Sequence, residues 1–298
     1  MKYRHTFHAG NFADVHKHVT LLALLAALKR KDKGFLYLET HAGRGAYDLS
    51  GSSGESALGI ARLAAQHPAG AADASVAEEI RHYQDRVAQL RRGRGQARLY
   101  PGSPLLAAGE LRPQDRAVLV ERLPPEARAL ERALSSQGLR GGAGPARSPD
   151  PAHHITVETG DGFERLRAWL PPPERRGLTL IDPPYEESRG DFERARHAAA
   201  EALRRFHTGV VTIWYPIKDE RDTAAWLAAL AGELDCPLLA AELSLYPRDS
   251  RVALNGSGML ILNPPYQLAE RMEIWLPQLH GRLDVGHGGG ASVRLLRA

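Results

Sequence analysis

The segment at residues 177–181, followed by Asp182, two prolines and Tyr185, constrains the fold of this chain more than any other. Its apolar residues run without polar alternation, which is typical of a strand buried on both faces inside a parallel sheet. Proline cannot continue a ladder and restricts the residue before it, so Asp182 is expected at the carboxyl end of this strand. Open α/β sheets bind their ligands at that edge. An acceptor, a rigid turn and an aromatic ring there predict a pocket for a flat, polar ring.

Other apolar segments of strand length alternate with helical patterns through most of the chain. The last two expected strands are separated by a polar loop, which indicates antiparallel pairing. The pattern predicts a Rossmann-like α/β fold with a seven-stranded, mostly parallel sheet, an antiparallel end strand and helices on both faces. The strands are expected near residues 35–39, 117–121, 154–158, 177–181, 209–215, 237–246 and 258–262.

Residues 50–98 break this alternation, because no convincing strand occurs among them. Ser75 to Glu78 has the sequence of a capping box, and apolar residues then recur at helical spacing. A shorter helix is expected at residues 55–66. We therefore expect a catalytic domain formed by residues 1–49 and 99–298, with residues 50–98 as an inserted helical subdomain.

Charge, cysteine content and apolar run length limit the class of protein. A formal net charge of +4 permits contact with nucleic acid without establishing it. The single cysteine, Cys236, excludes an internal disulfide framework and fits a reducing cytosol. The longest apolar run, at residues 19–28, is too short to span a bilayer. We expect a soluble, cytoplasmic protein with no membrane association.

Polar or glycine-rich loops follow three successive expected strands. The loop at 41–45 includes Gly43, which lets backbone approach a ligand closely; Glu121 ends the second strand; Asp161 and Gly162 follow the third. A carboxylate can accept hydrogen bonds from both hydroxyls of a ribose, and a second one from an exocyclic amine. Neither a phosphate-binding P-loop nor the G-x-G-x-x-G of NAD binding is present. Together these features predict S-adenosylmethionine as the cofactor.

Beside such a cofactor, Asp182 has a specific chemical use. The exocyclic amine of adenine is a weak nucleophile, because its lone pair is delocalised into the ring. The Asp182 carboxylate and the Pro183 carbonyl can accept from that amine and stabilise the charge that it acquires as it attacks a sulfonium methyl. Asp182 can also take the proton that leaves. Tyr185 offers a stacking face for a base pulled out of its helix. The alternative is that this motif is merely a rigid turn.

Several short segments carry a resemblance to a known family. They are Tyr3-Arg-His, Phe7-His-Ala-Gly-Asn, Ala13-Asp-Val, Lys17-His18, Tyr37-Leu to Thr40-His-Ala-Gly, Tyr100-Pro-Gly-Ser-Pro104 and Leu180-Ile-Asp-Pro-Pro-Tyr185. The chain is similar to amino-methyltransferases with the [DNS]-P-P-[YFW] motif and, nearly end to end, resembles RlmJ-type enzymes. These methylate the N6 of an adenine in large-subunit (23S) ribosomal RNA. The resemblance implies a class I methyltransferase domain with a small helical insertion.

The resemblance also implies roles for individual residues. Asp182 would be the catalytic acceptor, with Pro183 and Tyr185 beside it. Tyr3, followed by Arg4, would contact the RNA substrate and help to close the site. We expect a monomer whose partner is ribosomal RNA. The residues that would line the cofactor and base pocket are Lys17, His18, His41, Ser103, Glu121, Asp161, Gly162 and Asp182.

Two further features compete with these assignments. Four histidines near the amino terminus match no common zinc-binding pattern, and we expect no metal there; they are His5, His8, His16 and His18. The sequence Asn263-Pro-Pro-Tyr266 also satisfies the [DNS]-P-P-[YFW] pattern. It follows an expected antiparallel strand, whose end should point to the opposite edge of the sheet. We therefore expect a structural turn at Asn263.

Other function classes remain open from the sequence. A DNA adenine-N6 methyltransferase would use the same pocket, whereas a non-catalytic nucleic-acid-binding protein would not bind the cofactor. The sequence does not identify the target adenine. Phosphate contacts are expected from cations that lie close in sequence to the presumed mouth of the site; these are Arg4, Lys17, Lys29, Arg30, Lys31 and Arg44.

Overall fold

The computed structural model describes residues 9–51, 54–66, 75–92, 98–139, 154–186, 188–247, 250, 252 and 254–298. Tyr3, Arg4, His5 and His8 lie outside these ranges, so the RNA-contacting role expected for Tyr3 and Arg4 stays a prediction. Within the described ranges, every helix is too short or too polar to cross a membrane.

A single large sheet runs through the molecule, with its strands in the order β10-β8-β9-β7-β6-β1-β4-β5. The Rossmann-like α/β fold predicted from the sequence is confirmed. One strand more than the seven expected joins the sheet, because β10 is half-exposed and lacks a sustained apolar pattern. Five strands are parallel: β1 (Leu36–Glu39), β4 (Arg116–Glu121), β5 (Ile155–Thr159), β6 (Gly177–Ile181) and β7 (Val210–Ile217). At the other end, β9 (Gly256–Leu262) pairs antiparallel with β7 and with β8 (Leu238–Ser244), and β10 (Gly290–Arg297) pairs antiparallel with β8.

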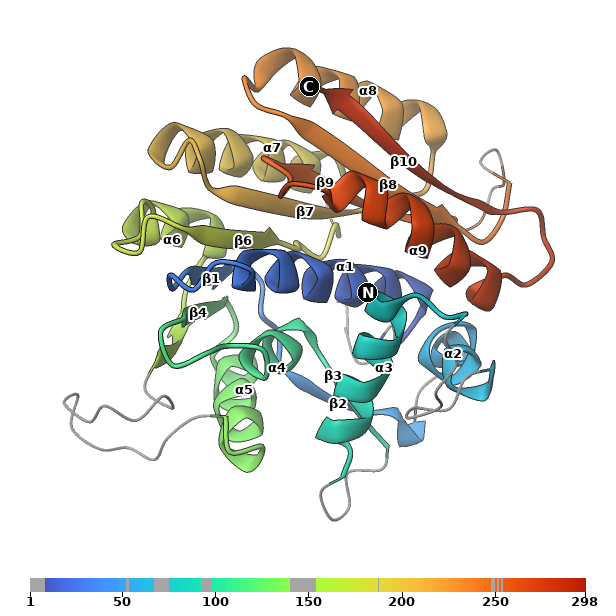
Figure 1. The fold of residues 1–298 in the computed structure, drawn as a ribbon, viewed down its shortest axis with the longest axis horizontal. Coiled ribbons are helices and arrows are strands. Elements are labelled where there is room, and N and C mark those ends of the chain that lie inside the picture. The colour runs from blue at the N-terminus through green and yellow to red at the C-terminus, as the bar shows by residue number, and fades with distance from the viewer. Residues whose placement is uncertain are drawn as a thin grey trace.

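Helices cover both faces of this sheet (Figure 1). Successive residues of a strand point to opposite faces, so Leu36 and Leu38 of β1 belong to one hydrophobic core and Tyr37 to the other. Burial on both faces explains why the parallel strands have unbroken apolar sequences. The first core is covered by α6 (Gly162–Trp169), α7 (Ser188–Arg205) and α8 (Glu220–Glu233), and the second by α1 (Phe12–Lys29), α4 (Ser103–Ala108), α5 (Pro124–Ser136) and α9 (Leu268–Leu283).

The segment expected to be a helical insertion is helical in its described part. It leaves and rejoins the main domain through the antiparallel pair β2 (Ala46–Asp48) and β3 (Leu99–Pro101). Ile80 and Tyr83 are fully buried in the same core as α1, so these helices pack onto the catalytic domain. Whether they form a subdomain of their own stays a prediction. The elements are η2 (Leu49–Gly51), η3 (Gly54–Leu58), α2 (Ile60–Gln66) and α3 (Glu78–Leu90).

The expected capping box of α3 is wrong. Its N-cap is Ala77, which makes no side-chain cap bond. The Ala77 backbone N–H instead donates to Oε1 of Gln278 on α9, at 2.9 Å. A tertiary contact from α9 therefore satisfies a backbone donor at the start of α3.

Helix α1 begins at the cap residue Asn11. Asn11 Oδ1 accepts from the backbone N–H of Asp14, and Asp14 Oδ2 accepts from that of Gly10, both at 2.9 Å. The other oxygen of Asp14 lies 2.9 Å from the Nζ of Lys17. The Asp14 carboxylate therefore positions the Lys17 ammonium, and the backbone N–H of Gly10 in turn holds that carboxylate in place.

Candidate active site

The carboxyl ends of β1, β4, β5 and β6 meet at one edge of the sheet, and the loops that follow them form the candidate site. The backbone N–H of Gly43, in the loop after β1, donates to Glu121 Oε2 at 2.8 Å. Glu121 Oε1 accepts from the backbone N–H of Leu123 at 2.7 Å. Burial raises the pKa of Glu121. A carboxylate has about four acceptor positions, so Glu121 keeps capacity for a ligand's hydroxyl groups.

The loop after β5 packs against the loop after β1. A Cβ on Gly162 would lie 1.8 Å from the carbonyl oxygen of Thr40, so only glycine fits there. Asp161 caps α6 by accepting from the backbone N–H of Phe163, and its second oxygen lies 2.7 Å from Nη2 of Arg194 on α7. Burial raises the pKa of Asp161, but the pairing with Arg194 outweighs it, and the pKa is lowered overall.

An ion pair connects the end of β6 with α1. Oδ2 of Asp182 lies 2.6 Å from Nζ of Lys17, whose second partner is Asp14. The three side chains are at most 10% exposed. Burial lowers the pKa of Lys17, but the two carboxylates outweigh it, and the pKa is raised well above its ordinary value. The Lys17 ammonium is therefore retained at neutral pH.

Glu39, the last residue of β1, is a site residue that the sequence analysis missed. Its carboxylate is fully buried and accepts from the hydroxyls of Tyr37 and Ser103. Burial raises the pKa of Glu39 to about 7, and the charges of Asp182 and Lys17 also act on it. Ser103 is thus connected to the candidate site by its hydrogen bond to Glu39. The signal was present, because Glu39 ends an apolar strand as Glu121 does.

His41 lies between the loops after β1 and β5. Its Nδ1 is 2.7 Å from Oγ1 of Thr40, and its ring meets the Phe163 ring edge-on at 4.8 Å. Burial lowers the pKa of His41 to about 4, so the ring is neutral at neutral pH. A neutral imidazole here can donate or accept a hydrogen bond from a ligand without adding charge.

His18 does not join the other predicted site residues directly. It is 1% exposed, and its Nδ1 lies 2.9 Å from the hydroxyl of Tyr100, which in turn lies 3.1 Å from that of Tyr83. The ring stacks on Tyr100 at 5.7 Å. His18 is thus part of a buried aromatic cluster, and its contact with the cofactor stays a prediction.

Tyr185 is buried, contrary to the expectation of an open stacking face. Its side chain is 3% exposed and its hydroxyl donates to the carbonyl oxygen of Trp214 at 2.7 Å. The ring packs against Phe192 at 4.7 Å and Trp214 at 5.6 Å. A base could stack on it only if one of these two rings moved. Pro183, beside it, is also buried.

The second motif copy lies at the opposite edge of the sheet, as expected. Leu262 of β9 pairs with Val211 near the start of β7. The Asn263 side-chain amide donates to the carbonyls of His207 at 2.7 Å and Gly209 at 3.0 Å. Asn263 therefore stabilises the turn that enters β7.

The expected ring of cations around the site is wrong for Lys29, Arg30 and Lys31. Lys17 and Lys29 are 12 residues apart on α1 (29 − 17), which is about 18 Å along a helix. The chain then enters β1, so these three cations lie at the amino edge of the sheet. Arg44 stays near the site but pairs with Glu126 at 2.8 Å.

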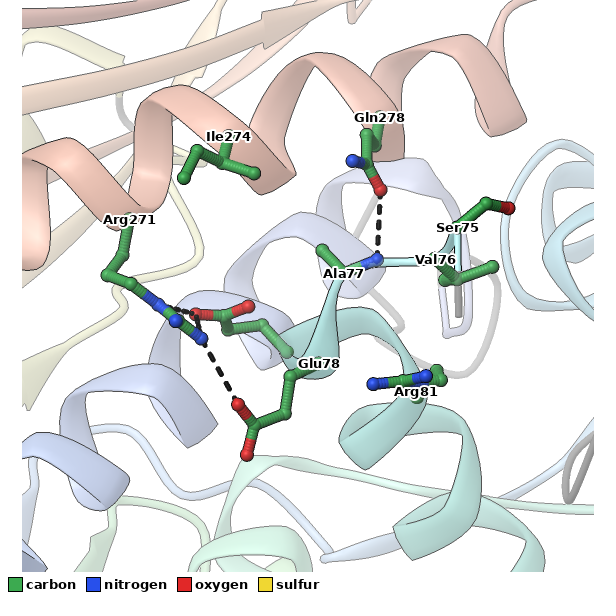
Figure 2. A pocket seen from close by; sticks show the side chains of 9 residues that line it. Ser75, Val76, Ala77, Glu78, Arg81, Arg271, Ile274 and Gln278 are labelled. Atoms are coloured by element: carbon green, nitrogen blue, oxygen red, sulfur yellow. Dashed lines mark hydrogen bonds and ion pairs between the residues drawn. The ribbon is translucent and has the colours of Figure 1, made fainter. Parts of the chain in front are cut away.

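A pocket of about 260 Å³ lies elsewhere, between α3 and α9 (Figure 2). Its charged groups satisfy one another, because Arg271 pairs with Glu78 and Glu79. None of the predicted site residues lines it. In the described part of the chain, no cluster of three or more His, Cys, Asp or Glu could hold a metal ion.

Comparison with known proteins identifies the family. The family model described as "Ribosomal RNA large subunit methyltransferase D, RlmJ" matches residues 32–296. The chain belongs to the RlmJ family. Two curated relatives are each named Ribosomal RNA large subunit methyltransferase J. The Haemophilus influenzae protein is 38% identical over 283 residues, which cover 94% of this chain and 92% of the relative. The Escherichia coli protein is 38% identical over 297 residues, which cover 98% of both chains.

A solved structure supports the same placement. The crystal structure of a Legionella pneumophila protein is 33% identical, covers 97% of this chain and 98% of its own, and superposes with a TM-score of 0.80. The RlmJ family match includes the predicted site residues from His41 onward. Lys17 and His18 lie before it but within the reach of the Escherichia coli relative, which covers nearly the whole chain.

Proposed function

We propose that this chain transfers the methyl group of S-adenosylmethionine to the exocyclic N6 of an adenine in large-subunit ribosomal RNA. The observation that carries the proposal is the Lys17–Asp182 ion pair at the end of β6, on the same sheet edge as Gly43, Glu121 and Asp161. Membership in the RlmJ family supports ribosomal RNA as the substrate.

The loops after β1, β4 and β5 fit this cofactor. Glu121 would accept from the ribose hydroxyls, and Asp161 from the adenine amine once Arg194 gives way. Gly43 and Gly162 lie where a side chain would overlap neighbouring atoms, so backbone can approach a ligand closely. When bound, the cofactor supplies an electrophilic sulfonium methyl. It would lie within reach of the end of β6.

Asp182 and Pro183 would hold the target amine. Lys17 occupies Oδ2 of Asp182, and Oδ1 has no donor among the described residues, so it can accept from N6. The cofactor would supply the methyl group to N6 and would keep the electron pair of the broken methyl–sulfur bond on sulfur. The nitrogen acquires positive charge that these acceptors stabilise, and its proton passes to Asp182. The base must leave its stack to reach them.

The decisive variant is Asp182→Asn, which keeps the shape but removes the carboxylate. We expect kcat to fall by at least about 100-fold, because the acceptor for the developing charge is weakened. The matched control is Asn263→Ala in the second motif copy. It should cost about 1–3 kcal/mol of stability by leaving two carbonyls unpaired, yet retain most of the activity.

The measurement is mass spectrometry of nucleosides from unmodified large-subunit ribosomal RNA after incubation with protein and S-adenosylmethionine. N6-methyladenosine is the expected product. Duplex DNA is assayed in parallel, and methylation of DNA alone would make the protein a DNA methyltransferase. Absence of cofactor binding by calorimetry, with RNA still bound, would leave a non-catalytic binding protein.

A further inference from the structure

The amino edge of the sheet, opposite the candidate site, carries exposed cations next to an exposed aromatic ring. Arg30, Lys31 and Lys33 lie between α1 and β1, and Tyr266 lies between β9 and α9. Nη1 of Arg30 donates to the carbonyl oxygen of Tyr266 at 3.4 Å, so the elements are contiguous. We call this surface the rear patch; it consists of Arg30, Lys31, Lys33 and Tyr266.

The exposed cations of the rear patch are not needed to terminate α1. Cations often stabilise the free carbonyls of a helix end. Here Arg112 donates to the carbonyls of Lys29 at 3.3 Å and Lys31 at 3.0 Å, and Arg176 donates to that of Leu28 at 2.6 Å. The terminal carbonyls are thus satisfied by two other arginines, and the side chains of Arg30 and Lys31 stay exposed.

Positive charge on this surface is only weakly balanced. Among the described residues, no carboxylate forms an ion pair with Arg30, Lys31 or Lys33. The acid between them, Asp32, accepts from the neutral amide of Gln114 and offsets one of the three positive charges.

Tyr266 is held on a fixed turn while its ring stays in solvent. The side chain is 81% exposed, the largest value among the exposed large hydrophobic residues described. Asn263, at the start of the same turn, is anchored by its two amide hydrogen bonds. Asn263 and Gln267 both have positive φ, which fixes the turn's path. An aromatic ring on a fixed turn beside cations suits a nucleic-acid base with its phosphates.

We infer that the rear patch binds a second segment of the ribosomal RNA substrate, with its cations on phosphates and Tyr266 stacked on an unpaired base. The identity of the RNA rests on the proposed function. Arg30 lies 13 residues beyond Lys17 on the same helix axis (30 − 17), about 20 Å from the candidate site. An RNA that contacts both must extend at least about six base pairs from the target adenine. An acidic protein is the competing occupant, because tyrosine is also enriched in protein interfaces, and the test below separates the two.

The test compares two RNAs that carry the target adenine found by mass mapping. One is a hairpin too short to reach the rear patch, and the other is a long fragment of large-subunit RNA. The variants are Tyr266→Ala and the pair Lys31→Glu with Lys33→Glu. The matched controls are Ile274→Ala, an exposed apolar residue on α9, and Arg128→Glu with Arg132→Glu, exposed on α5.

On the long RNA, the KM should rise at least about fivefold for Tyr266→Ala, and about tenfold or more for the charge reversal, with kcat unchanged. On the hairpin both variants should match the wild type, as the controls should on both RNAs. The slope of log affinity against log salt should decrease in magnitude for the charge reversal, by about 0.7 for each lost phosphate contact.

Equal effects on both RNAs, or no effect on the long RNA, would overturn the inference. A defect seen only on ribosomal particles would assign the rear patch to a protein partner instead and would also overturn it. If wild-type protein methylates neither RNA, the proposed function fails. The rear patch is then judged by fluorescence anisotropy of the long RNA, where the same variants must bind more weakly than the controls.

Discussion

Two acids of the candidate site have contrasting surroundings, although both end a buried strand. Asp182 meets the Lys17 ammonium at 2.6 Å. In the described part of the chain, Glu39 has only hydroxyl donors, from Tyr37 and Ser103, and burial raises its pKa to about 7. Near neutral pH, Glu39 is therefore a group that changes protonation. Burial of the ionised Glu39 carboxylate destabilises the fold, and this penalty applies only at higher pH, where the group is ionised.

Replacing Glu39 by glutamine should change how stability depends on pH. A carboxyl whose pKa rises from 4.5 to about 7 on folding stabilises the protein fully below pH 4.5, and that stability is lost as pH rises through 7. The wild type should therefore lose about 2–3 kcal/mol relative to Glu39→Gln between pH 5 and pH 8. Urea denaturation across this range measures the difference. A constant difference would show that Glu39 does not titrate in the folded state there.

Glu39 also shows how far individual site residues could be predicted from the sequence. Asp182, Glu121 and Asp161 were found because each follows a strand and precedes a turn signal. Glu39 also ends a predicted strand, but the functional role was assigned to the glycine-containing loop that follows it and not to Glu39. The pairing of Asp161 with Arg194 could not be predicted, because 33 residues separate them and only the packing of α7 brings them together.

At the scale of elements, one buried acid ties three helices together. Glu110 follows α4 and pairs with Lys29 of α1 and with Arg86 and His82 of α3, the last at 3.0 Å. Burial raises the pKa of Glu110, but the hydrogen bonds from His82 and Lys29 and the charge of Arg86 outweigh it, and the pKa falls to about 2. The inserted helix α3 is thus fastened to α1 by charge as well as by its apolar face.

Glu110→Gln should destabilise the protein by about 2–3 kcal/mol at neutral pH, because cations lose a carboxylate that is 2% exposed. The lowered pKa means that this stability is fully present above pH 4.5 and lost as pH falls through 2. Glu110 stays ionised between pH 5 and 8, so the part of the loss that comes from Lys29 and Arg86 should stay constant there. Hydrogen exchange should show weaker protection in α3. Unchanged protection there would mean that the apolar contacts alone hold α3.

The elements themselves were largely predictable, whereas their ends were not. Apolar periodicity located the helices and the parallel strands. The start of α3 was misplaced because Gln278 of α9 supplies its cap from a distant part of the sequence. The start of α1 depends on Asn11 and Asp14 together, because both side chains accept from backbone N–H groups there. Strand β10 was missed because its half-exposed residues carry little apolar pattern.

At the scale of the whole molecule, the direction of each strand determined which edge of the sheet a loop could be assigned to from the sequence. Parallel strands bring their carboxyl ends together, so the loops after β1, β4, β5 and β6 could be assigned to one edge. The same reasoning placed Asn263 at the other edge. It was not applied to α1, which crosses the sheet from one edge to the other, and so Lys29 to Lys31 were expected at the wrong end. Proximity in sequence is a poor guide along an 18-residue helix.

The loop after β5 and helix α7 meet at the candidate site through Asp161 and Arg194. Asp161 belongs to the loop after β5, and Arg194 to α7, which follows β6 and covers the same core as α6. Their 2.7 Å pair occupies an oxygen that the proposed cofactor's adenine would use. The amine and Arg194 would donate to the same oxygen, so binding is expected to weaken a partly exposed ion pair. Such a pair contributes at most about 1 kcal/mol, so the competition is weak but measurable.

Arg194→Ala should therefore bind S-adenosylmethionine up to about fivefold more tightly, because Asp161 no longer exchanges one partner for another. Arg196→Ala on the same helix, whose partners are Glu193 and Glu233, should leave the affinity unchanged. Isothermal titration calorimetry measures both. Weaker binding by Arg194→Ala would instead make Arg194 a direct contact of the cofactor, and α7 would then close over the ligand rather than compete with it.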